Sequence, residues 1–130
     1  MKDNKSLTAL INVKNQTNGL FTGGKDCVQF NGTDAQLENI MKEFKQNKHL
    51  FLNPIDKSIC HFLADNKEYK QSKHYDTLAQ TVLILLGYEG QAAYDNGDKK
   101  LETEVLKDII IWQYMNQYAR KVAGEKWLKL

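Results

Sequence analysis

The pattern of apolar residues changes at Thr33, and this change constrains the fold more than any other feature of the sequence. After Thr33, apolar residues recur at intervals of three and four, which is the period of an α-helix with one buried side. They are Leu37, Ile40, Met41 and Phe44. Thr33 with Gln36 three residues later also forms a capping box, a common helix start. The sequence therefore predicts a helix from Thr33 to about Asn47.

The segment before Thr33 has a different pattern, typical of short strands and turns. Its apolar runs Leu7–Val13, Leu20–Thr22 and Cys27–Phe30 are brief, and clusters of Asn and Gly separate them. We therefore expect residues 1–32 to form a small antiparallel hairpin or meander.

Most of the remaining chain is predicted to be helical. Asn53-Pro54 favours a helix start, and a third helix is expected over about Lys73–Leu86, ended by Gly87. The longest helix is expected over about Lys99–Ala123, and the short run His49–Leu52 is expected to be a strand. The predicted fold is one α+β domain over residues 1–130, with a small N-terminal antiparallel sheet followed by a mainly helical C-terminal part.

Length and composition are those of an ordinary globular domain. The chain has 130 residues, of which 42% are hydrophobic and 26% charged. No apolar run approaches the ~18 residues that span a bilayer. The first ten residues lack the apolar stretch of a signal peptide. We expect a cytoplasmic protein without a membrane span, although export after removal of a signal peptide stays open.

The segment Gly19–Asp26, GLFTGGKD, lies one residue from a phosphate-binding loop. Gly19, Gly24 and Lys25 fit the pattern G-x-x-x-x-G-K-[ST], but Asp26 replaces the hydroxyl residue that would hold magnesium. The residues that follow predict a strand, whereas a phosphate loop leads into a helix. We therefore expect a turn and no nucleotide.

Cysteine and histidine residues are the next candidates for chemistry. Zinc sites use closely spaced pairs of these residues, and the sequence places Cys27, Cys60, His49, His61 and His74 without such pairs. No catalytic signature surrounds Cys27 either. We expect no metal, cofactor or catalytic residue. Reduced thiols are favoured for the two cysteines, and a disulfide between them stays open.

A calcium loop is suggested by Asp95 and Asp98, which flank Asn96-Gly97. Calcium loops of this type need Gly at their sixth position and a liganding Glu at their twelfth, and this segment lacks both. The segment instead predicts a turn that leads into a helix cap.

Charge argues against a dedicated nucleic-acid binder. The net charge is +2, acidic and basic residues are evenly mixed, and Arg120 is the only arginine. The basic stretch Arg120–Lys129 is the one candidate patch, and cations are also common at helix C-termini.

Two features suggest a protein-binding surface in the C-terminal half. Ile109–Trp112 places four bulky apolar residues around one helical turn, which must be enclosed by the domain itself or by a partner. We expect Ile109 and Trp112 to lie in the core, on the central helix of the fold. All tyrosines and tryptophans also lie after Phe62. Such side chains suit surfaces that are wet when free and buried when bound. The candidate partner-binding residues are Tyr75, Tyr88, Tyr94 and Trp127.

These features favour a small non-enzymatic binding or inhibitor protein that acts by protein–protein interaction. Immunity proteins and antagonists carried by phages or mobile elements are of this general kind. The alternative is a nucleic-acid-associated protein, and a small enzyme is the third hypothesis. The partner would be another protein, and a homodimer is possible. For the tyrosines, the alternative to a partner-binding surface also stays open: their rings lie across the core of the fold.

Overall fold

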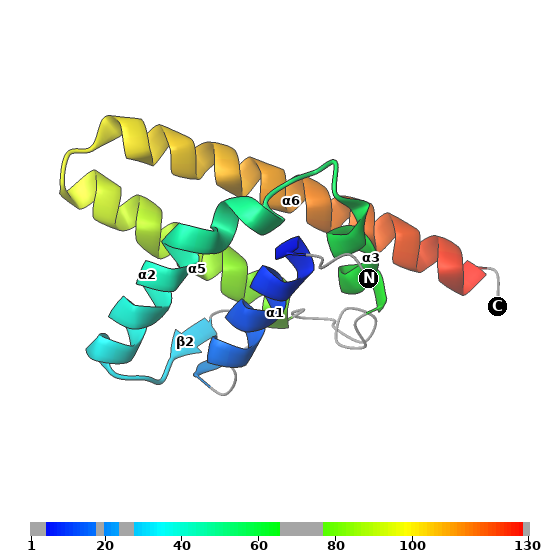
Figure 1. The fold of residues 1–130 in the computed structure, drawn as a ribbon, viewed down its shortest axis with the longest axis horizontal. Helices are drawn as coiled ribbons and strands as arrows, with labels where there is room; N and C mark the ends of the chain where they lie inside the picture. Colours follow the sequence, from blue (N-terminus) through cyan, green and yellow to red (C-terminus); the bar gives the residue numbers. More distant parts are fainter. Residues whose placement is uncertain (1–4, 18–19, 24–27, 66–76, 129–130) are drawn as a thin grey trace.

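Helices dominate the computed structural model, which describes residues 5–17, 20–23, 28–65 and 77–128. In chain order the elements are helix α1 (Lys5–Thr17), strands β1 (Phe21–Gly23) and β2 (Val28–Phe30), and helices α2 (Asp34–Phe51), α3 (Lys57–Asp65), α5 (Thr77–Asp95) and α6 (Lys99–Leu128). Figure 1 shows α6 running the length of the molecule, with α5 antiparallel to its first half. Helix α3 packs on the second half of α6, and α1 packs on α2.

The expected α+β fold with an N-terminal sheet is wrong. In the described residues, strand pairing consists of β1 and β2, three residues each, from Phe21 opposite Phe30 to Gly23 opposite Val28. The run Leu7–Val13 lies in α1. Its buried residues Ala9, Leu10 and Val13 follow helical spacing, so one side of α1 can bury against α2.

The expected strand at His49–Leu52 is also wrong, because α2 continues through Phe51. Ile40, Phe44 and Phe51 are buried on one side of α2. Ending the helix at Asn47 would separate Phe51 from this buried side. The Leu52 N–H closes the helix by donating to the Lys48 carbonyl at 2.9 Å.

Helix α3 begins three residues later than Asn53-Pro54 would suggest, because Asp56 takes the capping role. The Asn53 side chain instead accepts a backbone hydrogen bond within a turn. The Asp56 carboxylate accepts from the backbone N–H of Ser58 at 3.0 Å and from its hydroxyl at 2.5 Å. Hydrogen bonds from Ser58 and from Ser6 of α1 hold the pKa of Asp56 below its ordinary value. Asp56 therefore ties the start of α3 to α1.

Gly87 does not end α5, which continues to Asp95. The core-facing side of the helix extends past Gly87 through Glu89 and Ala93, so continuation buries more of the chain. The turn predicted at Asn96-Gly97 is confirmed, since Gly97 has φ +69°, a backbone conformation that glycine adopts at no steric cost. The Asp98 side chain caps α6 by accepting from Leu101 N–H at 3.1 Å, as predicted.

The capping box at Thr33 is confirmed. The Thr33 hydroxyl accepts from the Gln36 backbone N–H at 3.1 Å, and the Gln36 side chain accepts from the Thr33 N–H at 2.8 Å. Two backbone donors at the start of α2 are satisfied in this way.

Replacing Thr33 with Ala should lower the free energy of unfolding by about 1 kcal/mol, because the N–H of Gln36 loses its acceptor. Urea denaturation followed by circular dichroism measures this loss. A Thr33→Ser variant, which keeps the hydroxyl, is the matched control and should remain close to the wild type. Equal denaturation midpoints for Thr33→Ala and the wild type would contradict the role of the cap.

Candidate functional site

Trp112 determines which side of α6 faces the core. Its side chain is 1% exposed, and its indole N–H donates to the Ala79 carbonyl of α5 at 3.0 Å. The ring also meets Phe51 of α2 edge-on, with 6.0 Å between ring centroids. A buried indole needs such an acceptor, so the rotation of α6 about its axis is set by this contact. The predicted burial of Trp112 is confirmed.

The opposite side of α6 exposes large apolar side chains. Leu106 is 55% exposed, Ile110 65% and Tyr114 58%. Residues four apart on a helix are neighbours, so the three form one line along α6. Ile109 is only partly buried. The expectation that Ile109 lies in the core is met only in part, since Ile109 packs against the core from its edge. The turn Ile109–Trp112 is not enclosed by the described residues, because Ile110 is exposed.

A groove between α5 and α6 extends this apolar line. It has a volume of about 360 Å³ and includes Tyr94, which is 67% exposed, and Leu106. The two helices approach closely at Gly90, where an added Cβ would lie 3.3 Å from Cγ1 of Val105. We call Tyr94, Leu106, Ile110 and Tyr114 the hairpin face.

Of the predicted partner-binding residues, the two whose side chains are described, Tyr88 and Tyr94, lie on different surfaces. Tyr94 belongs to the hairpin face, whereas Tyr88, 40% exposed, lines a different groove between α5 and α2. These two positions lie about 120° apart around α5, since six residues on a helix turn through 600°. Tyr75 lies outside the described residues, and Trp127 lies in α6 without a described side chain.

Sequence reasoning missed Leu106, Ile110 and Tyr114 as surface residues. Their spacing of four was visible, but it also fits a buried side of a helix. A second line of apolar residues on the other side of α6 could have shown which side is exposed. It includes Val105, Trp112 and Met115, all buried. A helix with apolar residues on two sides can bury one side in its own domain and leave the other exposed.

A charged cluster lies where α2, α5 and α6 meet. Lys48 Nζ is 2.6 Å from Glu89 Oε1 and 2.8 Å from Asp108 Oδ2. Burial alone would lower the pKa of Lys48, but its hydrogen bonds with Asp108 and Glu89 outweigh that effect and raise the pKa above its ordinary value. Lys48 is therefore held in its charged form.

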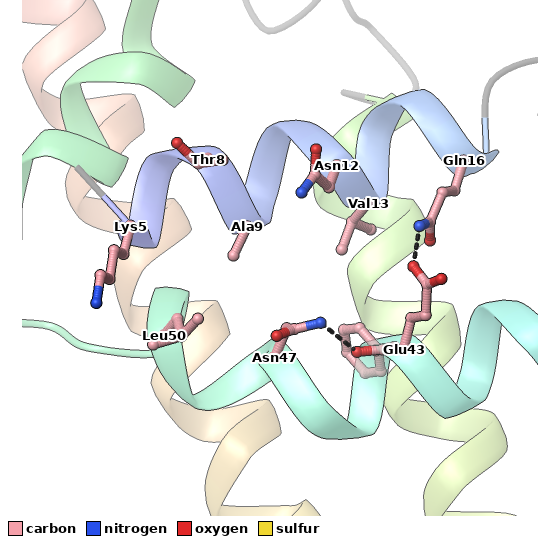
Figure 2. Close-up of a pocket in the computed structure, with 10 residues that line it drawn as sticks. Lys5, Thr8, Ala9, Asn12, Val13, Gln16, Glu43, Asn47 and Leu50 are labelled. Atoms are coloured by element: carbon pink, nitrogen blue, oxygen red, sulfur yellow. Dashed lines mark hydrogen bonds between the residues drawn. The ribbon is translucent and has the colours of Figure 1, made fainter. Parts of the chain in front are cut away.

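A cleft between α1 and α2, shown in Figure 2, is lined by polar side chains over a buried Phe44. Its volume is about 380 Å³. The Gln16 amide donates to the Glu43 carboxylate, and the Asn47 amide donates to the Glu43 carbonyl at 3.0 Å. Gln16, Glu43 and Asn47 are thus partly engaged with one another, and Lys5, Thr8 and Asn12 also line the cleft.

The other chemical candidates remain separate. Within the described ranges, no group of three or more His, Cys, Asp or Glu residues is placed to hold a metal ion. Cys60 is a buried free thiol whose pKa is raised by burial, whereas Cys27 and His74 lie outside the described residues. Lys25 and Asp26 lie outside them too, and β2 follows this segment where a phosphate loop would begin a helix.

No protein-family model, curated protein or solved structure matches this chain. Among the helices described, none combines the length and apolar character needed to cross a membrane.

Gly87 and Gly90 both line the α5–α6 groove, and replacing each with Ala should change the free energy of unfolding differently. No atom of the described residues lies within 4 Å of a Cβ added at Gly87. Gly87→Ala should therefore raise the free energy of unfolding by about 0.5–1 kcal/mol, since Ala loses less backbone entropy in a helix.

Gly90→Ala should gain less or destabilise, because its Cβ presses on Val105. Urea denaturation of both variants measures the difference. A larger gain at Gly90 than at Gly87 would show that the helices are not packed as described.

Proposed function

We propose that this chain is a small non-enzymatic binding protein, of the immunity-protein or inhibitor type, that engages another protein through the hairpin face. The observation that carries this proposal is the exposure of Leu106, Ile110 and Tyr114 in one line, each more than half exposed. Single exposed apolar residues are ordinary, but a contiguous group that continues into a groove is typical of an interaction surface.

The rigidity of the hairpin supports the proposal. Helices α5 and α6 are joined by the short turn Asn96–Asp98, and Trp112 anchors α6 to Ala79 of α5 at the far end of the pairing. A surface fixed in this way loses little conformational entropy when a partner binds. The two tyrosines of the face, Tyr94 and Tyr114, add large contact area with few torsions to freeze.

The composition of the face indicates the chemistry of its partner. Its centre is apolar, while Glu102 and Lys107 at its margins carry opposite charges. Apolar centres with polar margins are typical of protein–protein interfaces, whereas nucleic acid requires a concentrated basic surface. A partner helix or strand with two or three bulky apolar side chains fits this arrangement.

Ile110→Asp tests the proposal, because it places a carboxylate in the middle of the face. Ile110 is 65% exposed, so stability should change by no more than about 0.5 kcal/mol. A protein captured from a host lysate by the wild type should bind Ile110→Asp with a loss of about 2 kcal/mol or more. Titration calorimetry with the purified partner measures the loss.

Ile55→Asp is the matched control, because Ile55 is 85% exposed and lies in the connection before α3, outside the α5–α6 hairpin. It should bind the same partner with wild-type affinity. Equal affinities of the wild type and Ile110→Asp, with both proteins folded, would contradict the proposal. If the wild type self-associates and Ile110→Asp is monomeric, the partner is a second copy of the chain.

A further inference from the structure

Glu89 holds a buried carboxylate oxygen that lacks a donor. The side chain is 2% exposed, and Oε1 accepts from Lys48. Oε2 is closed to solvent and has no hydrogen-bond partner among the described residues. Leaving a buried charged acceptor unpaired costs more than a typical hydrogen bond contributes, so such an atom calls for an explanation.

The charges around Glu89 do not balance within the cluster. Lys48 is shared between two carboxylates, those of Glu89 and Asp108. One ammonium between two carboxylates leaves a net negative charge when all three groups are ionised. Asp108 is 22% exposed and can be solvated, whereas Glu89 is sealed from water. Glu89 Oε2 is therefore the atom of the cluster that lacks a positively charged donor.

Glu89 also lines a groove between α2 and α5 with a volume of about 700 Å³. This is enough room for a small ligand or a long side chain. Leu37 and Met41 of α2 with Tyr88 and Ala92 of α5 form its apolar part. The groove thus combines this apolar part, bordered by charged residues of α2, with one buried carboxylate that lacks a donor.

We propose that this groove binds a small organic cation, in which a guanidinium or ammonium group on a short apolar stem donates to Glu89 Oε2. The stem would lie against Leu37 and Met41. A cation of this kind supplies both the donor and the positive charge that the cluster lacks. Arginine and lysine side chains carry the same chemistry, so the cation can be a free molecule or part of a polypeptide.

Access to Oε2 requires a lining side chain to move, since this atom is closed to solvent. The lining includes the long side chains of Met41, Lys42 and Lys45, which have many rotamers. Neither lysine donates to Glu89 Oε2 in the structure. The site lies on the α2 side of α5, away from the hairpin face, so it does not rest on the proposed function.

Butylguanidinium and butylurea form a matched pair of probes, with the same shape and different charge. Heteronuclear NMR titration of the full chain should show saturable shifts at Glu89 and Ala92 with butylguanidinium, with a Kd of about 1 mM for so small a ligand. Butylurea should bind at least about tenfold more weakly, since it is neutral and cannot supply the positive charge that the cluster lacks.

Glu89→Gln keeps the side-chain shape and should weaken butylguanidinium binding at least about tenfold. Glu104→Gln removes an exposed acidic charge from α6 and is the control for net charge. Should Glu89→Gln fail to fold, Ala92→Phe serves instead: it fills the groove from an exposed position and should abolish binding.

Arginine blocked at both backbone ends distinguishes the two sources. Tighter binding than butylguanidinium favours a polypeptide side chain, and weaker binding favours a free cation; both results support the site. Absence of saturable binding, or equal binding of butylguanidinium to the wild type and to Glu89→Gln or Ala92→Phe, would overturn the proposal.

Discussion

The buried indole of Trp112 determines how the longest helix lies on the rest of the fold. Its N–H has one acceptor, the Ala79 carbonyl, and its ring is held against Phe51. These contacts join α6 to α5 and α2 at once. Since a helix is a rigid rod, fixing one residue of α6 in this way fixes the direction of every other side chain on it. The hairpin face is therefore a consequence of where Trp112 is buried.

Lys48 provides a second, electrostatic tie among the same three helices. It joins α2 to Glu89 of α5 and Asp108 of α6. Removing one member of a buried charged cluster leaves the others uncompensated, so this tie favours one arrangement of the helices over alternatives. It also leaves Glu89 with the unsatisfied oxygen on which the proposed cation site depends. Helix packing thus produces two surfaces on different sides of α5.

Three local signals in the sequence predicted local structure correctly, whereas the helix end expected at Gly87 was wrong. The capping box at Thr33, the Asn96-Gly97 turn and the Asp98 cap each depend on residues within a few positions, and all three are confirmed. The run Leu7–Val13 is so short that it fits both the strand period and the helix period, and we expected a strand. Packing against α2 favours the helix that the structure shows. The Lys48–Glu89 pair joins residues 41 positions apart, so no local pattern in the sequence predicts it.

Local sequence pattern cannot show which of the two apolar sides of α6 is buried, because that depends on packing partners elsewhere in the chain. Hydroxyl-radical footprinting of the free protein in dilute solution tests directly which side is buried. We expect strong labelling of Tyr94 and Tyr114 and protection of Trp112, in line with their exposures of 67%, 58% and 1%. Labelling of Trp112 together with protection of Tyr114 would contradict this expectation.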